Sequence, residues 1–119
     1  MDPKEVQISK KETLTELEGM ITEVEKMEAE ESEKKESIKE LKSEMAAIKK
    51  DFDTAAKKFD KKIIKKIEAS VKRVEGKIKN AGKKFTKSGK RAASGLKRLA
   101  ARSKSMGQKF YKKMKAALS

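Results

Sequence analysis

The sequence predicts an all-α protein. Its fold class is long heptad-patterned helices, arranged as a helical hairpin or a coiled-coil pairing, with a basic amphipathic C-terminal helix. Three observations lead to this class. The only proline is at position 3, where a helix start tolerates it. Apolar residues recur at steps of three and four along much of the chain. Charged residues make up 44% of the 119 residues and aromatic residues only 4%, which is unlike an ordinary globular core.

Residues 1–36 are predicted to form an acidic helix followed by a polar connection. Asp-Pro-Lys-Glu at 2–5 and Ser-Lys-Lys-Glu at 9–12 both fit an N-cap with a carboxylate three residues later. Residues 28–36 have no apolar anchor except Ala29, so they suit either a continuous polar helix or a connection between helices. The apolar face of the first helix carries Leu14, Leu17, Met20, Ile21, Val24 and Met27.

Residues 37–75 are predicted to form one long helix, which opens with a second capping motif, Ser-Ile-Lys-Glu at 37–40. Its pairing seam alternates steps of three and four and then, from Phe59, takes steps of four that locally unwind a supercoil. A straight helix of this length would measure about 58 Å and cannot bury its apolar stripe alone. Its partner is either the first helix folded back or another copy of the chain, so a homo-oligomer is expected. The pairing seam comprises Ile38, Leu41, Met45, Ile48, Phe52, Ala55, Phe59, Ile63 and Ile67.

Residues 76–119 are predicted to form a basic helix that binds nucleic acid. They contain 15 Lys and Arg and no acid, whereas residues 1–36 carry a net charge of −6. Five glycines, each costing about 1 kcal/mol of helix stability, would by themselves suggest a disordered tail. At 100° per residue, however, the small and apolar residues fall on one face and the Lys and Arg residues on the other. We therefore expect a helix that is marginal alone and forms when both of its faces are satisfied.

The small face of this segment favours close helix–helix packing in an assembly of several copies. Small residues let two backbones approach, and Ala81-Gly82, Ser88-Gly89 and Ser94-Gly95 recur every six or seven residues. The alternative is that these glycines mark hinges.

Catalysis finds no support in the sequence. There is no Cys and no His, so thiol nucleophiles, disulfides, the usual zinc sites and His-based proton transfer are excluded. No Gly-rich phosphate loop or calcium loop is present. We expect a protein that is not an enzyme and that needs no cofactor or metal.

The sequence also limits where the protein is expected to act. No apolar run reaches the roughly 18–20 residues that span a bilayer, and the N-terminus has no apolar signal segment. We expect an intracellular protein, associated with a nucleoid or chromatin or lying inside a virion. It is not expected to be secreted or transmembrane.

The expected partner is duplex nucleic acid, with DNA favoured over RNA. The net charge is +14, and Lys and Arg on a helix bind phosphates without reading bases. The segment has few amide side chains that could read bases, only Asn80 and Gln108. It also has few aromatic residues that could stack on bases, only Phe85, Phe110 and Tyr111. We expect sequence-independent coating or compaction, as in nucleoid or viral nucleocapsid proteins. The binding residues are predicted to be Lys83, Lys84, Lys87, Lys90, Arg91, Lys97, Arg98, Arg102, Lys104, Lys109, Lys112 and Lys113.

Two other functions remain open from the sequence. A Lys-rich helix with a Phe, Leu and Met stripe also describes a helix that lies on an anionic membrane surface. A protein-only coiled-coil scaffold or capsid component would use the pairing seam alone. Some lysines could form ion pairs within the protein instead of binding a polyanion. The pairs at 57–58, 61–62 and 65–66 could face the acids of the first helix, which include Glu16, Glu18, Glu23 and Glu25.

Overall fold

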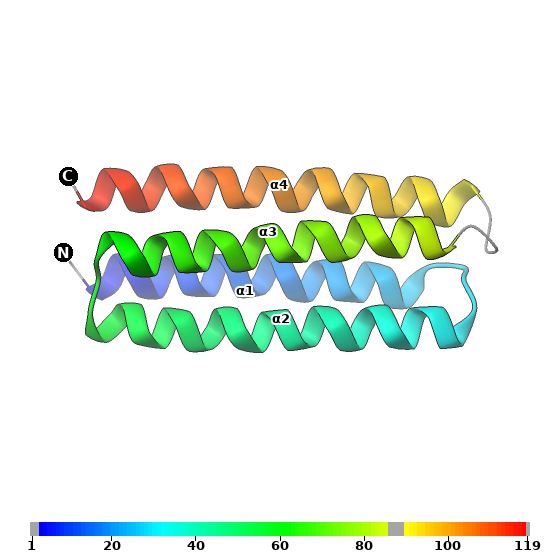
Figure 1. Ribbon diagram of the computed structural model, residues 1–119, viewed down its shortest axis with the longest axis horizontal. Helices are drawn as coiled ribbons and strands as arrows, with labels where there is room; N and C mark the ends of the chain where they lie inside the picture. The colour runs from blue at the N-terminus through cyan, green and yellow to red at the C-terminus, as the bar shows by residue number, and fades with distance from the viewer. Residues whose placement is uncertain (1–2, 86–89, 119) are drawn as a thin grey trace.

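In the part of the chain that the structure describes, the computed structural model is a bundle of four helices that run alternately in opposite directions along one axis (Figure 1). The helices are α1 (Pro3–Lys26), α2 (Glu31–Lys57), α3 (Lys61–Lys84) and α4 (Lys90–Leu118). The structure describes residues 3–85 and 90–118, and side chains for all of these except Pro3, Lys84, Lys90 and Leu118. The described residues contain no strand, so the predicted all-α class is confirmed.

Each helix spans most of the length of the bundle. The molecule measures 47 × 20 × 19 Å, and helices of 24–29 residues are about 36–44 Å long at 1.5 Å per residue. Short connections place the start of α1, the α2–α3 connection and the end of α4 at one end of the bundle (Figure 1). Every apolar stripe can therefore be buried inside a single chain.

The single helix predicted over residues 37–75 is wrong, because the chain turns back after Lys57 and α3 begins at Lys61. The carboxylate of Asp60 caps α3 by accepting a hydrogen bond from the backbone N–H of Ile63 at 3.0 Å. Turning back also lets Ile63 and Ile64 reach the common core, where both are buried. The steps of four that began at Phe59 thus mark a change of helix and not a locally unwound supercoil.

The connection between α1 and α2 shows that residues 28–36 do not form one continuous helix with α1. The α1 helix ends at Lys26 and α2 begins at Glu31, so a turn separates two helices. The ammonium group of Lys34 donates to the backbone carbonyls of Glu25 and Met27, at 3.0 and 3.1 Å, and so binds the C-terminal end of α1.

The helix starts predicted at Ser9 and Ser37 are wrong. Ser9 lies within α1 and Ser37 within α2, and both side chains are buried. Each serine falls on the inward side of its helix, so burial and not capping accounts for its position. The sequence pattern of a cap does not distinguish a serine that begins a helix from a serine that is buried inside one.

The boundary predicted at residue 76 is not a helix boundary. The α3 helix continues through Gly76 to Lys84, and α4 begins at Lys90. The predicted basic helix is therefore the end of one helix plus the whole of another. The Ser88-Gly89 pair lies outside the described residues.

The pairing seam is buried within one chain. Leu41, Ile48 and Phe52 of α2 are at most 4% exposed, and Ile63 and Ile67 of α3 are also buried. The remaining large seam residues are partly buried and pack against the same core; these are Ile38, Met45 and Phe59. The seam meets helices of its own chain, and α4 completes the core with Phe85 from the end of α3 and with Leu96, Leu99, Phe110 and Met114.

The small residues of α4 allow close packing inside the bundle. A Cβ atom on Gly107 would lie 3.1 Å from Cγ1 of Val71, and one on Gly82 would lie 3.7 Å from Cβ of Leu96. Both contacts join α3 to α4, the two helices that share the most extensive contact. The small face thus serves an intrachain contact, and the assembly of several copies stays a prediction.

Candidate nucleic-acid interface

Charge is divided unevenly between the two halves of the bundle. The α3 helix carries ten Lys and Arg and two acids, and α4 carries ten Lys and Arg and no acid. The α1 helix has a net charge of −2 and α2 has a net charge of zero. Since α3 and α4 are neighbours, most of the positive charge of the protein gathers on one side.

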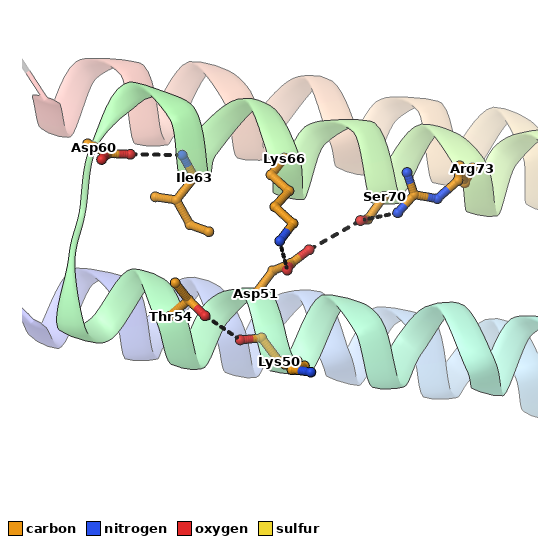
Figure 2. A network of polar contacts seen from close by, with 8 residues as sticks. All are labelled: Lys50, Asp51, Thr54, Asp60, Ile63, Lys66, Ser70 and Arg73. Atoms are coloured by element: carbon orange, nitrogen blue, oxygen red, sulfur yellow. Dashed lines mark hydrogen bonds and ion pairs between the residues drawn. The ribbon is translucent and has the colours of Figure 1, made fainter.

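Acids of α2 bind the bases of α3 that face it. Lys66 lies 3.5 Å from the buried carboxylate of Asp51, which also accepts a hydrogen bond from Ser70 (Figure 2). Arg73 donates to Ser70 at 2.6 Å and to Glu44 at 3.2 Å. Lys77 lies 3.7 Å from the same glutamate. These ion pairs hold the α2–α3 hairpin together.

Acids of α1 bind two bases of α4 across an open groove. The guanidinium group of Arg102 donates to Glu16 at 3.1 Å and to Glu23 at 3.0 Å. It lies against the bare backbone of Gly19, between the two carboxylates, and the hydrogen bond to Glu16 is the main cause of its raised pKa. Lys113 pairs with Glu12 at 3.3 Å.

The acids of the first helix do not bind the lysine pairs that the sequence offered as their partners. Glu16 and Glu23 bind Arg102 of α4, and Lys66 binds Asp51 of α2. Among the residues that the structure describes, no lysine at 57–58, 61–62 or 65–66 forms an ion pair with an acid of α1. The reason is the turn after Lys57, which places α3 beside α2 and α4 instead of beside α1.

Other bases of α3 and α4 are exposed and have no ion-pair partner in the described part of the chain. Arg91, Arg98 and Lys109 line clefts between α4 and α1, whereas Lys104 and Lys112 face α3. Six predicted binding residues of α4 are exposed and unpaired in this way, and so is Lys83 at the end of α3. The predicted residues Lys84 and Lys90 lie in helices but have no described side chain, and Lys87 lies outside the described residues. The six exposed bases of α4 are Arg91, Lys97, Arg98, Lys104, Lys109 and Lys112.

A groove of about 700 Å³ runs between α3 and α4. Two lysines from each helix line it, and its remaining walls include the carboxylates of Glu68 and Glu75 and the ring of Tyr111. Gly76 and Gly107 also line it, and neither has a side chain to fill it. The lining lysines are Lys72, Lys79, Lys104 and Lys112.

Lys72 and Lys79 are candidate binding residues that the sequence prediction missed. Each pairs with an acid of its own helix, Glu68 at 3.0 Å and Glu75 at 3.1 Å, and stays exposed. The predicted binding residues began at Lys83, within the segment from residue 76 that has no acid, whereas the tertiary structure places Lys72 and Lys79 opposite α4. Their only sequence signal was a seven-residue spacing.

The apolar stripe of the C-terminal segment lies in the core and not at the surface. Phe85, Leu96, Leu99, Phe110 and Met114 are each at most 5% exposed. A helix that inserted this stripe into a lipid surface would first have to leave the bundle. Within residues 3–85 and 90–118, no helix has the length and apolar content needed to cross a membrane. Across those same residues, no group of acidic side chains is arranged to hold a metal ion.

The chain matches no protein-family model, no curated protein and no solved structure.

Proposed function

We propose that this protein binds duplex nucleic acid without sequence specificity, through the exposed bases of α3 and α4. One observation carries the proposal. The α4 helix has ten Lys and Arg and no acid, and six of its exposed bases have no acidic partner among the described residues. Unneutralised charge of one sign repels itself and is offset when a polyanion binds.

The chemistry of the side chains favours phosphate contacts over base reading. Long Lys and Arg side chains on rigid helices neutralise phosphates and release counterions, which supplies affinity that does not depend on sequence. Of the aromatic residues of α4, Phe110 is buried in the core and Tyr111 lies in the α3–α4 groove. Few aromatic side chains are therefore exposed to stack on unpaired bases, which supports a duplex over a single strand.

The proposed biological role is to coat or compact a duplex, with several copies side by side, in a nucleoid or a virion. The role is structural and not catalytic. A membrane-surface role is the second candidate, because the same cations would attract anionic lipid. The buried apolar stripe makes it the weaker one, since little apolar surface is left to insert.

Salt dependence tests the proposal. If the protein neutralises about 6–10 phosphates, its affinity for duplex DNA should fall about 10³–10⁵-fold between 50 and 200 mM salt, and equally for unrelated sequences. The measurement is fluorescence anisotropy with two labelled duplexes of different sequence. A flat salt response, or a strong preference for one duplex, contradicts the proposal. Binding to anionic vesicles that persists at high salt would support the membrane role instead.

A further inference from the structure

The contacts between α3 and α4 fix which residues of the two helices face each other. Val71 meets Gly107, and Leu96 meets Gly82, so moving eleven residues along one helix moves eleven residues back along the other. The two helices are therefore antiparallel in a single register over this length. This register places Lys72 beside Lys104 and Lys79 beside Lys97.

Lysines recur on both walls of the α3–α4 groove with the same spacing. Lys65, Lys72 and Lys79 are seven residues apart on α3, and Lys97 and Lys104 are seven apart on α4. Seven residues make nearly two helical turns, so each set lies in a row with steps of about 10.5 Å. Lys112 of α4 also lines the groove, eight residues beyond Lys104. The groove is thus lined by two lysines from each helix, and the two rows extend beyond it through Lys65 and Lys97.

We infer that the α3–α4 groove receives a phosphodiester strand of the bound duplex, and that lysines from both helices contact it. The inference rests on the proposed function and extends it from α4 alone to a surface built by two helices. An anion between the two rows interacts with cations on both sides, whereas an anion on the ridge of α4 meets only one row. Gly76 and Gly107 leave room at the bottom of the groove for the strand to approach.

The two acids of the groove act against a bound strand. Glu68 and Glu75 hold Lys72 and Lys79 by ion pairs within α3. These acids would repel a phosphate and compete with it for the same two lysines. Neutralising the acids and neutralising the lysines should therefore change the affinity in opposite directions.

The first test removes one facing pair of lysines. The variant Lys72→Gln with Lys104→Gln is compared with the control Lys39→Gln with Lys42→Gln, two exposed α2 lysines that have no ion pair in the described residues. Both variants lose the same charge. The slope of log affinity against log salt should fall by about 1.8 in the groove variant, at roughly 0.9 per lost phosphate contact, and should change little in the control.

The second test removes the groove acids. Glu68→Gln with Glu75→Gln should bind duplex DNA more tightly than Glu18→Gln with Glu25→Gln, which removes the same charge from the exposed side of α1. Acetylation of the unmodified protein, mapped by mass spectrometry, gives a measurement that needs no variant. A bound duplex should protect Lys72 and Lys104 and leave Lys39 and Lys42 reactive.

The outcomes separate the two proposals. If the unmodified protein does not bind duplex DNA, the proposed function itself is wrong. If it binds, but the groove and control variants lose affinity equally and no lysine of the groove is protected, the inference about the groove is overturned while the proposed function stands.

Discussion

The ring of Phe52 meets the ring of Phe110 edge to face in the buried core of the bundle. The ring centroids are 5.5 Å apart and the planes are inclined at 82°. Phe52 belongs to α2 and Phe110 to α4, which lie across the bundle from each other. The contact therefore joins the two helical hairpins, one almost neutral and one strongly basic, through the core.

The aromatic pair should show a measurable coupling in a double-mutant cycle. An edge-to-face pair contributes about 0.5–1.5 kcal/mol beyond its buried area. Phe52→Leu and Phe110→Leu keep an apolar side chain, so the variants should stay folded. The free energies of unfolding in urea should show a coupling of that size. Strictly additive losses would mean that the rings fill space without interacting specifically.

Two glycines of the α3–α4 hairpin should respond differently to alanine. A methyl group on Gly76 meets nothing within 4 Å, so Gly76→Ala should raise the free energy of unfolding by about 1 kcal/mol through helix propensity. On Gly107 it would lie 3.1 Å from Val71, so the same gain is offset by displacing that side chain. Urea denaturation measures both. An equal gain at both positions would show that the close approach of the helices is not required.

Removing the hydroxyl of Ser103 should stabilise the protein. This side chain is 0% exposed, and its hydroxyl oxygen has no hydrogen-bond partner in the described part of the structure. An unsatisfied buried polar group costs about 1–3 kcal/mol, so Ser103→Ala should recover part of that cost. The control is Ser105→Ala, an exposed position of the same helix that gains only helix propensity. If the two variants gain equally in thermal or urea unfolding, the hydroxyl is satisfied after all.

Low pH should weaken the ion pair between Lys10 of α1 and Asp53 of α2. The ammonium group of Lys10 donates to Asp53 at 2.8 Å, and this hydrogen bond holds the pKa of the Asp53 carboxyl below its ordinary value of 3.8. A carboxyl pKa that is lower in the folded state contributes stability above its unfolded value, and the contribution disappears as the pH falls through the folded value. The parent should thus be more stable than Asp53→Asn at pH 7, and the difference should vanish in acid. A difference in urea midpoint that does not change with pH would contradict this.

Arg102 should matter less for duplex binding than its neighbour Lys104. Two carboxylates of α1 already occupy its guanidinium group, while Lys104 has no ion-pair partner among the described side chains. Under the proposed function, Lys104→Gln should lower the salt slope by about 0.9 and Arg102→Gln by clearly less. Anisotropy titrations at several salt concentrations measure both slopes. Equal slopes for the two variants would show that a duplex displaces α1 from Arg102.

Periodicity and composition in the sequence determined the helical class, the apolar faces and the gathering of bases towards the C-terminal end. These are local properties, because a helix face is defined by residues three and four apart. The same pattern could not place the turn after Lys57. The apolar spacing changes to steps of four at Phe59, but no glycine or proline lies at the turn, so the same change is also the pattern of one continuous helix with a locally unwound supercoil. In the structure the cap by Asp60 marks the new helix.

Tertiary structure alone decided which bases remain available. Arg102 and Lys104 are equivalent in the sequence, two positions apart in a segment without acids, yet one faces the acids of α1 and the other the groove beside α3. Ion pairs depend on distances between residues far apart in the chain, and these distances exist only once the apolar stripes pack together. For the same reason Lys72 joined the candidate site only when the register of α3 against α4 was known.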